Sequence, residues 1–522
     1  MSRRALFALV VLQAAIGFFQ HRAVFGELSS FAGDARTAST AVTWPPGSSV
    51  LLVAAIVLIA FLVVPRRAGE PASDRAGRIG AAGLTLIAAL GLLHVAIGLV
   101  AGRLTLWLTV PFLLVCGAAA IGIQRFAPGH EAALDAAQQA DGFSWWDVAS
   151  AVLLLTSFAA MTFPYAFEDA RAIWGCRAFA LDSTGTLAGL ASCSHRNYPP
   201  LLSVLLWMTV RDPLFQGRLL VWLSLVLFVL FFRSRLRAVA PDYAAPALLF
   251  FVSTVHVWEG TATIYADAPL MIFLSAGTLL VLGRPGLGDG PPVMERVAGS
   301  LCLAAAVLIR PDGFYYLAVV AAAVVVARVL WRERFPWAVF VLPIAAATAW
   351  DFRPAALSPP SRIAAAYSGS FLGNATGEWR GVAETAGAAF WKVMIVFLHA
   401  WQGQWLSHKG LGFAIYLLVG VTIVAARRGV FSGGADILFP ETRLAGLVTL
   451  GGLLAVVVCF AAVPFVSDPV GAVQPFAGDY LACYRNFVRV GLGRMTVHLY
   501  PVACLFVVGL LTALGRTSDA AS

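Results

Sequence analysis

Charge is scarce in this chain. Only 12% of its 522 residues are charged, whereas 60% are hydrophobic, and lysine occurs just twice, at Lys392 and Lys409. A soluble globular domain carries about 25% charged residues, so the composition excludes an ordinary soluble protein. The mean hydropathy of +0.83 agrees with this, and the net charge of +9 rests almost wholly on arginine.

Several patterns that mark particular functions are also missing. The sequence has no glycine-rich nucleotide loop, no CxxC or His/Cys metal pattern, no internal repeat of fixed period, and no basic run interleaved with aromatic residues. These absences argue against nucleotide-dependent chemistry and against a zinc site. They also lead us to expect no nucleic-acid partner.

What the sequence has instead is a series of apolar runs, several of them about 20 residues long, enough to cross the hydrocarbon core of a bilayer as a helix. In lipid the backbone must satisfy its own hydrogen bonds, which favours helices. We therefore expect an all-α polytopic membrane protein with about 14 transmembrane helices. The expected spans are 5–20, 49–64, 80–100, 104–123, 148–164, 215–232, 243–256, 268–283, 297–309, 314–331, 336–350, 410–426, 444–464 and 499–515.

Arginine clusters set the expected orientation. With the N-terminus inside, the densest clusters fall in cytoplasmic turns, as the positive-inside rule requires. The loops 165–214, 351–409 and 465–498 then lie outside. The N-terminus resembles a signal peptide without a clear cleavage site, so we expect an uncleaved first helix. The clusters are Arg66, Arg67, Arg75 and Arg78; Arg233, Arg235 and Arg237; Arg328, Arg332 and Arg334; and Arg427 and Arg428.

Three other stretches complete the expected organisation. The apolar stretches 198–210 and 388–402 are too short to be spans, and we expect them to lie in the membrane interface or to dip partway in. The polar stretch 124–147 is expected to be a cytoplasmic linker. It separates an N-terminal four-helix membrane segment, 1–123, from a membrane domain, 148–515, that carries nearly all the unusual residues.

Two sets of polar residues lie in the first long outer loop. Glu168 and Asp169 directly follow an apolar run, with Arg171 two residues later. One carboxylate could act as a general base, although acidic residues also favour the first turn of any helix. His195 and Tyr198 precede a Pro-Pro pair. A helix start with aromatic anchoring explains the tyrosine and the prolines, but it does not require the histidine.

Further charged residues lie directly beside apolar runs. Asp267 opens a span, where helix capping is the simplest explanation. Arg310 and Asp312 separate two apolar runs, and Arg494 and His498 approach the last span. Such arginines can fork onto a phosphate or snorkel to the headgroups. Charges at membrane level are costly. All of these groups fall on one side of the membrane, which favours a shared site for an anionic, membrane-borne substrate.

The chain has seven cysteines, and two of them, Cys176 and Cys193, share one expected outer loop. An oxidising compartment would permit a disulfide between them. Cys483 is also expected outside, so the pairing stays open at this point.

The order of these motifs resembles the GT-C class of integral-membrane glycosyltransferases. An acidic pair after a span is followed by HRNYPPLL, YADAPL and RPDGFYYL, and then by an arginine shortly before the last helix. The likeness is greatest to the bacterial glycosyltransferase 39-like group, kin to protein O-mannosyltransferases and the lipid A aminoarabinose transferase. It covers about residues 148–515 and leaves out the four front helices.

The resemblance implies a GT-C type helical bundle in the inner cell membrane of a bacterium, with an extracytoplasmic active site. It implies an inverting transfer of a sugar from a polyprenyl-phosphate donor to a hydroxyl of a lipid, glycan or protein. Asp169 would be the catalytic base, with Glu168 able to substitute. Some members use a divalent metal, and no cofactor is certain. The expected substrate-binding residues are Arg171, His195, Tyr198, Asp267, Arg310, Asp312, Arg494 and His498, with Arg494 at the donor phosphate.

Two other functions remain open. A secondary transporter would also carry intramembrane charges, but usually near the bilayer midplane on broken helices, and often with internal repeats. A lipid-linked-sugar flippase would keep the arginines and would tolerate loss of Asp169.

Overall fold

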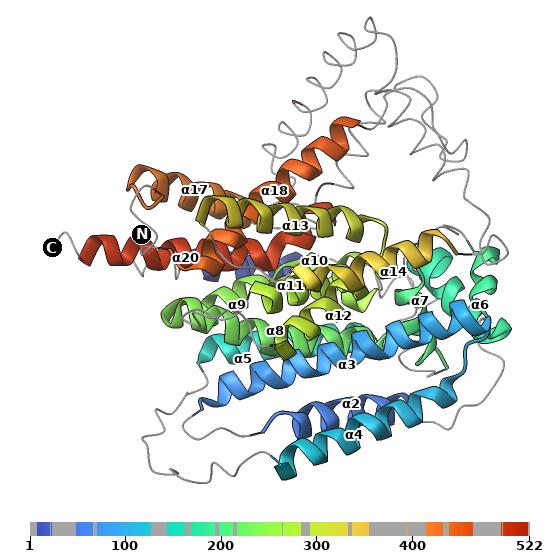
Figure 1. Ribbon diagram of the computed structural model, residues 1–522. Coiled ribbons are helices and arrows are strands. Elements are labelled where there is room, and N and C mark those ends of the chain that lie inside the picture. The colour runs from blue at the N-terminus through green and yellow to red at the C-terminus, as the bar shows by residue number, and fades with distance from the viewer. Residues whose placement is uncertain are drawn as a thin grey trace, which may run out of the picture.

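The computed structural model describes most of the chain. The described residues are 8–20, 22, 48–65, 70–126, 144–161, 169–193, 198–211, 217–263, 265–282, 293–331, 337–353, 394, 414–431, 438–462, 492 and 494–519. Over these residues the chain is helical and forms no strand (Figure 1). The predicted all-α class is therefore confirmed for this part of the chain.

The helices follow the predicted apolar runs closely, and each of the expected ranges overlaps at least one helix. The α-helices are the first helix (Ala8–Gln20), α2 (Ser48–Val63), α3 (Ala72–Ala101), α4 (Thr109–Phe126), α5 (Trp145–Ala160), α6 (Cys176–Thr184), α7 (Leu201–Trp207), α8 (Leu219–Val239), α9 (Ala244–Val252), α10 (Val255–Ala262), α11 (Asp267–Leu282), α12 (Val293–Ile309), α13 (Asp312–Trp331), α14 (Val341–Asp351), α17 (Ala414–Arg427), α18 (Pro440–Ala462) and α20 (Tyr500–Asp519). Shorter helical segments are η1 (Leu106–Leu108), η2 (Asp169–Gly175), η3 (Leu187–Ser192), η4 (Pro241–Tyr243), η5 (Trp337–Phe340) and η7 (Val497–Leu499).

Not all of these helices are long enough to cross a bilayer. Five are sufficiently long and apolar, and a sixth span results if α10 and α11, which meet at a 114° bend, are counted together. The other apolar helices are shorter than the roughly 20 residues that a span requires. The chain is thus a helical membrane protein, and the count of 14 spans stays a prediction. The five long helices are Ala72–Ala101, Leu219–Val239, Asp312–Trp331, Pro440–Val457 and Arg494–Arg516.

The two short apolar stretches, 198–210 and 388–402, are described to different extents. The stretch 198–210 forms the short helix α7, but all seven of its residues are buried, and α7 packs on α3, α6 and α12. The apolar residues of α7 therefore face protein, and its position relative to the membrane interface stays a prediction. Of the stretch 388–402, only residue 394 lies among the described residues.

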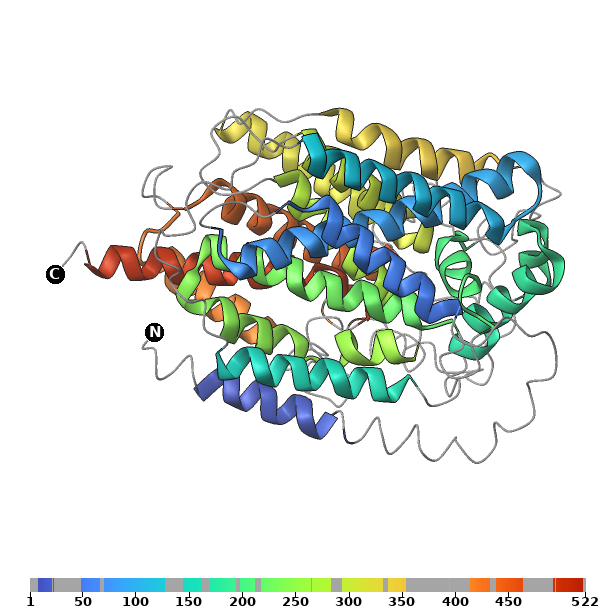
Figure 2. The ribbon, with the colours of Figure 1, turned by 90° about the horizontal axis from the view of Figure 1, so that it is seen from below.

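The helix α3 connects the front of the chain to the bundle. It packs along α8 and α12, while α2 and α4 form an outer layer on it (Figures 1 and 2). Glycines make the α3–α8 contact close: a Cβ atom on Gly80 would lie 2.3 Å from the carbonyl oxygen of Leu227. Small residues at membrane helix interfaces let backbones approach in this way. The segment 127–143, most of the predicted linker, lies outside the described residues, and the domain division stays a prediction.

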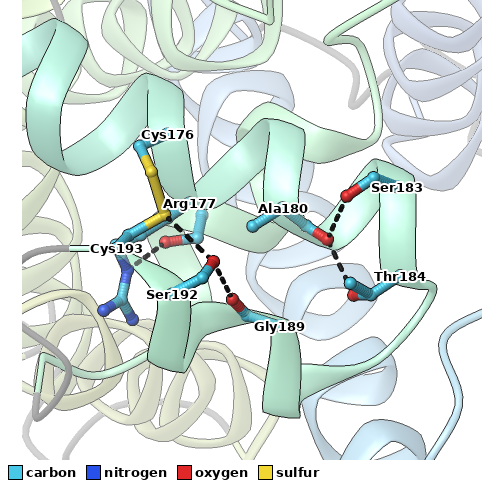
Figure 3. Close-up of a disulfide and its surroundings, with 9 residues drawn as sticks. Cys176, Arg177, Ala180, Ser183, Thr184, Gly189, Ser192 and Cys193 are labelled. Carbon is cyan, nitrogen blue, oxygen red and sulfur yellow. Dashed lines mark hydrogen bonds between the residues drawn. A yellow bond between two sulfur atoms is a disulfide. The ribbon is translucent and has the colours of Figure 1, made fainter.

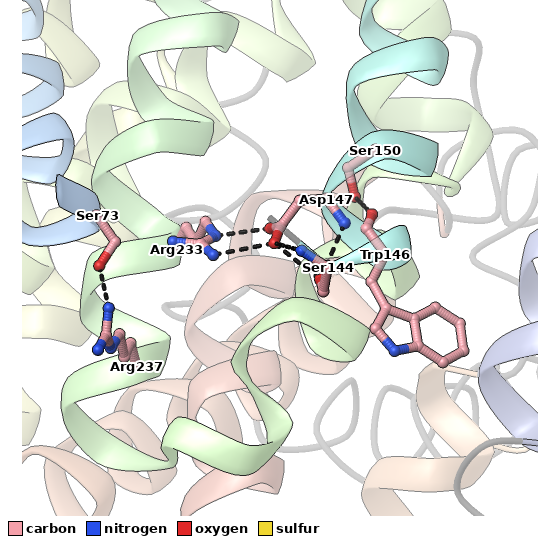
Figure 4. A network of polar contacts seen from close by, with 7 residues as sticks. All are labelled: Ser73, Ser144, Trp146, Asp147, Ser150, Arg233 and Arg237. Carbon is pink, nitrogen blue, oxygen red and sulfur yellow. Dashed lines mark hydrogen bonds and ion pairs between the residues drawn. The ribbon is translucent and has the colours of Figure 1, made fainter. Parts of the chain in front are cut away.

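Ion pairs join the helices at the arginine end of the bundle, which we define by Arg233, Arg235 and Arg237 at the end of α8. Arg233 donates Nε and Nη2 to the two carboxylate oxygens of Asp147, at 2.6 and 3.0 Å (Figure 4). Ser144 caps α5, because its Oγ accepts from the backbone N–H of Asp147, and the Asp147 carboxylate accepts in return from Ser144. Arg235 pairs with Glu295 of α12 at 3.0 Å, and Arg237 bonds Ser73 of α3. The end of α8 is thereby tied to the starts of α3, α5 and α12.

Candidate functional site

The opposite end of the bundle gathers charges at the termini of four helical segments. Asp267 opens α11, Arg310 follows the last residue of α12, Asp312 opens α13, and η7 leads into α20. In the sequence each of these charges directly borders an apolar run. Because the runs become packed helices, their ends meet, and the charges meet with them. We refer to Asp267, Arg310, Asp312, Arg494 and His498 as the Asp267 cluster.

Asp267 is the centre of this cluster. One carboxylate oxygen, Oδ1, pairs with Nη1 of Arg310, and Oδ2 accepts a hydrogen bond from Nε of Arg494 at 2.8 Å. Nε2 of His498 lies 3.3 Å from Oδ1. The aspartate side chain is buried, and a buried carboxylate requires such partners. Asp267 therefore holds cations from other segments, beyond any capping of its own helix.

From their positions in the sequence, Arg310 and Arg494 could have snorkelled to the lipid headgroups. In the structure both pair with carboxylates instead. Arg310 also pairs through Nε with Asp312, at 2.9 Å, so its guanidinium bridges two carboxylates. The Arg494 guanidinium lies over the ring of Tyr265, 4.8 Å from its centroid. The side chains of Arg310 and Arg494 are only 17% and 28% exposed. Two aspartates and two arginines balance in formal charge, so the cluster is neutral when His498 is neutral.

Burial lowers the pKa of Arg310, but the carboxylates of Asp312 and Asp267 raise it more, so that it ends above its usual value. This guanidinium is therefore charged at every physiological pH. A guanidinium has five N–H donors in a planar fork, and the two carboxylates engage Arg310 through Nε and Nη1. Further donors remain on the same fork for an anionic ligand, and forked donation is the geometry in which arginine binds phosphate.

His498 is fully buried in the cluster. Its ring packs edge-on against Tyr316, with 5.0 Å between centroids, and the Tyr316 hydroxyl donates to the carbonyl oxygen of Met495 at 2.6 Å. Among the described residues neither ring nitrogen makes a hydrogen bond of regular geometry, and Nε2 meets Asp267 only through the 3.3 Å approach to Oδ1. These contacts fix the ring plane, so His498 directs Nε2 toward Asp267.

Tyr198 lies close enough to the cluster to respond to its charges. Burial raises the pKa of the Tyr198 hydroxyl above its usual value, while Arg310 opposes this shift and Asp312 adds to it. The hydroxyl therefore stays protonated at neutral pH and can donate a hydrogen bond. The Tyr198 ring also contacts the buried Trp174, with 5.7 Å between ring centroids.

A brace that sequence reasoning missed fixes the backbone at Tyr198. Arg177 of α6 is fully buried. It donates Nη2 to the carbonyl oxygens of Tyr198 and Pro199, at 2.7 and 3.4 Å, and Nε to the hydroxyl oxygen of Ser203 at 2.9 Å. Burial and the nearby charge of Arg353 lower the pKa of Arg177. A guanidinium nevertheless stays charged at neutral pH, so these oxygens are needed to compensate for its burial.

A disulfide anchors the same brace. Cys176 and Cys193 are joined, with 6.0 Å between their Cα atoms, and Arg177 directly follows the first of them (Figure 3). The structure thus selects one of the pairings that the sequence left open. The bond ties the start of α6 to the end of η3 and holds Arg177 beneath the Tyr198 backbone. The sequence signal for Arg177 was its position beside Cys176.

The residues predicted to carry the chemistry are described only in part. Asp169 and Arg171 belong to η2, a π-helical segment that packs on α6 and α7, but their side chains are not among the described ones. Glu168 and His195 lie outside the described residues. Since Trp174 of η2 contacts Tyr198, this segment lies at the same end of the bundle as the Asp267 cluster. π-Helical turns occur frequently at functional sites.

The described part of the chain offers no group of three or more His, Cys, Asp or Glu side chains that could hold a metal ion. Asp267 and Asp312, the two carboxylates of the cluster, are both paired with arginine. We therefore derive no step through a metal.

No protein-family model, no curated protein and no solved structure matches this chain. The resemblance to GT-C glycosyltransferases thus rests on the sequence motifs alone. Of the expected substrate-binding residues, five form the Asp267 cluster and Tyr198 adjoins it. The cluster can hold an anionic group at the end of a membrane-embedded bundle.

Proposed function

We propose that this protein transfers a sugar from a polyprenyl-phosphate donor to a hydroxyl acceptor at the outer face of the membrane. The observation that supports this best is the Asp267 cluster, in which arginines from separate helices are held at one point beside apolar helices. A lipid phosphate combines the two properties that such a place binds: a hydrophobic chain and an anionic head.

The proposed reaction needs two contributions from the chain. The acceptor oxygen attacks the anomeric carbon, the bond from that carbon to the phosphate oxygen breaks, and the bonding pair leaves with the polyprenyl phosphate. The proton of the acceptor hydroxyl passes to Asp169, the proposed general base. Arg310 and Arg494 stabilise the negative charge on the departing phosphate, and stabilisation of developing charge is usually the largest contribution to catalysis.

Asp267 has a positioning role in this proposal. It holds Arg310 and Arg494 in fixed orientations before the donor binds, so little reorganisation is needed during the reaction. Preorganised cations in a dry site stabilise charge far better than mobile ones in water. The inverting outcome follows from direct displacement at the anomeric carbon.

The test uses purified full-length protein in nanodiscs, with a polyprenyl-phosphate sugar and a hydroxyl acceptor. Replacing the base in Asp169→Asn should slow transfer about 10²–10⁴-fold, while donor binding stays within about twofold. Arg494→Ala should weaken donor binding more than acceptor binding. An Asp169→Asn protein that turns over at the wild-type rate would remove the assigned base.

A secondary transporter is the second candidate, and one feature favours it: α9, α10 and α11 form a broken path, with a 114° bend between the last two. Broken helices line the substrate sites of many transporters. Proteoliposomes separate the two functions. Uptake of a sugar or lipid-linked sugar without formation of a glycosylated product would favour transport or flipping.

A further inference from the structure

Two arginines lie one turn apart at the start of α3, at the arginine end of the bundle, and their partners differ. Arg78 donates Nε to Oε1 of Glu70 at 2.8 Å, and its Nη2 donates to the carbonyl oxygen of Pro65 at 2.8 Å. In the part of the chain that the structure describes, no carboxylate pairs with Arg75. The described residues therefore leave the charge of Arg75 uncompensated.

The residues beside Arg75 in the chain are engaged by α8. Asp74 accepts a hydrogen bond from Oγ of Ser234 at 3.3 Å, and Oγ of Ser73 accepts from Arg237. These contacts hold the first turn of α3 on α8. Arg75 reaches a different neighbour, α2, which packs on α3 in the outer layer of the bundle (Figure 1).

The Arg75 guanidinium lies against an aromatic ring of α2. Its central carbon is 4.6 Å from the centroid of the Phe61 ring. Nε is enclosed and has no hydrogen-bond partner among the described residues, whereas the terminal nitrogens reach the surface. An enclosed N–H without a partner costs free energy, and an anion bound to the same fork offsets that cost. Forked donation is also the geometry in which arginine binds phosphate.

The Phe61 ring is the last member of an exposed apolar stripe on α2. The members recur at helical spacing and are all hydrophobic: Leu51, Ala54, Val57, Leu58 and Phe61. From Leu51 to Phe61 the stripe is about 15 Å long at 1.5 Å per residue. This length is the depth of one leaflet of a hydrocarbon core about 30 Å thick. An uncompensated cation thus lies at the end of an apolar surface that is one leaflet deep.

We propose that Arg75 and α2 bind one anionic phospholipid, with its phosphate on the Arg75 fork and an acyl chain along the stripe from Leu51 to Phe61. Snorkelling alone would also expose an arginine, but it requires neither the aromatic ring nor the stripe. Basic pockets between membrane helices on the cytoplasmic side bind anionic headgroups in this way, and the positive-inside rule predicts that side for this end.

The bound lipid contacts α2 through the stripe and α3 through Arg75, so it stabilises the outer layer on the bundle. The site lies at the end of the bundle opposite the Asp267 cluster, and the inference does not depend on the proposed function. A protein that transfers no sugar would still bind this lipid.

The first experiment measures bound lipid by native mass spectrometry. Purified full-length protein in detergent is titrated with phosphatidylglycerol, or with phosphatidylethanolamine that has the same acyl chains. The wild type should bind one phosphatidylglycerol more tightly than phosphatidylethanolamine. Arg75→Gln should weaken phosphatidylglycerol binding about tenfold and should remove the preference.

The matched control is Arg516→Gln. Arg516 also lies over an aromatic ring at the arginine end, 4.7 Å from the centroid of Phe439, but it is exposed. This variant loses the same charge and should bind phosphatidylglycerol as the wild type does. Wild-type affinity in folded Arg75→Gln would overturn the proposal. So would an equal loss in the two variants, because the attraction would then come from the whole basic surface.

Two further variants test the geometry and keep the test valid should Arg75→Gln fail to fold. Arg75→Lys retains the charge but loses the planar fork, so its affinity for phosphatidylglycerol should fall several-fold. Phe61→Leu retains an apolar side chain but removes the ring beneath the guanidinium, and it should also weaken binding several-fold. Wild-type affinity in both folded variants would contradict a site between α2 and α3.

Thermal unfolding separates a lipid from free phosphate. Phosphatidylglycerol should raise the melting temperature of the wild type but not that of Arg75→Gln, because a ligand stabilises only a folded state that binds it. Inorganic phosphate should raise neither. If inorganic phosphate stabilised the wild type as strongly as phosphatidylglycerol and had no effect on Arg75→Gln, the ligand would be a soluble anion and the lipid proposal would be wrong.

Discussion

Asp267 contacts three side chains from two parts of the chain remote from it, Arg310 in one and Arg494 and His498 in the other. From the sequence, each member of the cluster was identifiable as a charge bordering an apolar run. The pairings were not, because they depend on which helix ends meet. The contacts of Arg177 were not predictable from the sequence either. Its partners are backbone oxygens of Tyr198 and Pro199, and no sequence pattern encodes a contact of that kind.

The first prediction at this scale concerns Asp267→Asn. Removing the carboxylate charge leaves Arg310 and Arg494 partly uncompensated, and we expect a loss of about 1–3 kcal/mol in the free energy of unfolding. Thermal unfolding of the purified protein measures this. The control is Asp182→Asn. The ion pair between Asp182 and Arg211 is more exposed, so its loss should lower the free energy of unfolding by less than about 1 kcal/mol. Equal losses of stability in the two variants would contradict the inference that Asp267 compensates the buried charges of Arg310 and Arg494.

The second prediction concerns alkaline pH. Burial raises the pKa of Tyr198 in the folded chain, so above about pH 10 the unfolded chain loses the tyrosine proton first. The folded state should therefore lose stability as the pH rises through that region. In Tyr198→Phe this contribution is absent, and its melting temperature should fall less between pH 8 and about pH 11. Parallel curves for the two proteins would contradict the prediction.

At the scale of elements, the apolar runs predicted the positions of the helices well, because length and hydropathy largely determine where a membrane helix forms. Bends and local burial were not predictable in the same way. The break between α9 and α10 is stabilised by Tyr500 of α20, whose hydroxyl contacts Thr254 and the carbonyl oxygen of Phe250. The burial of α7 likewise depends on neighbours that are remote in sequence.

The disulfide brace provides the third prediction. The bond closes a loop with a sequence separation of 17 residues, and a loop of this length contributes about 3 kcal/mol. The double variant Cys176→Ser/Cys193→Ser should melt at a lower temperature and should bind donor more weakly, because Arg177 loses its anchor below Tyr198. Cys116→Ser, at a free cysteine, should change neither. A reductant that lowers the melting temperature of the double variant as much as that of the wild type would argue against this bond.

The fourth prediction concerns the contact between α3 and α8. Gly80→Ala places a methyl group against the Leu227 backbone and should destabilise the fold by about 1–3 kcal/mol. Gly117→Ala is the control, because its nearest neighbour would be an ordinary 3.9 Å contact with Ile59. Thermal unfolding of the two variants decides the matter, and similar melting temperatures would mean that the α3–α8 contact adapts easily.

At the scale of the whole molecule, the two ends of the bundle differ in kind. Two ion pairs between helices join the arginine end, Arg233 with Asp147 (Figure 4) and Arg235 with Glu295. The other end carries the Asp267 cluster and the disulfide. Disulfides form in oxidising compartments, and basic clusters stay in the cytoplasm. Both rules predict the same orientation, although they depend on different residues.

The fifth prediction tests that orientation. A cysteine introduced by Ser183→Cys in α6 lies on the surface near the disulfide, and one introduced by Ala238→Cys lies on the surface at the arginine end. A membrane-impermeant maleimide added to intact cells or spheroplasts should label the first but not the second. Permeabilised cells should show labelling of both. The reverse pattern would place the Asp267 cluster in the cytoplasm and remove the proposed reaction.

The glycine seam between α3 and α8 has a consequence for biogenesis. During synthesis α3 emerges from the ribosome well before α8. Its glycine-lined face, which exposes the helix backbone, therefore has no protein partner in the bilayer until α8 is made. Lipid tails are poor substitutes there, because they cannot match the ridge of Leu227 and Ser234 that later fills it. Completion of α8 should therefore act as a checkpoint, and chains truncated before it should be cleared by membrane proteases.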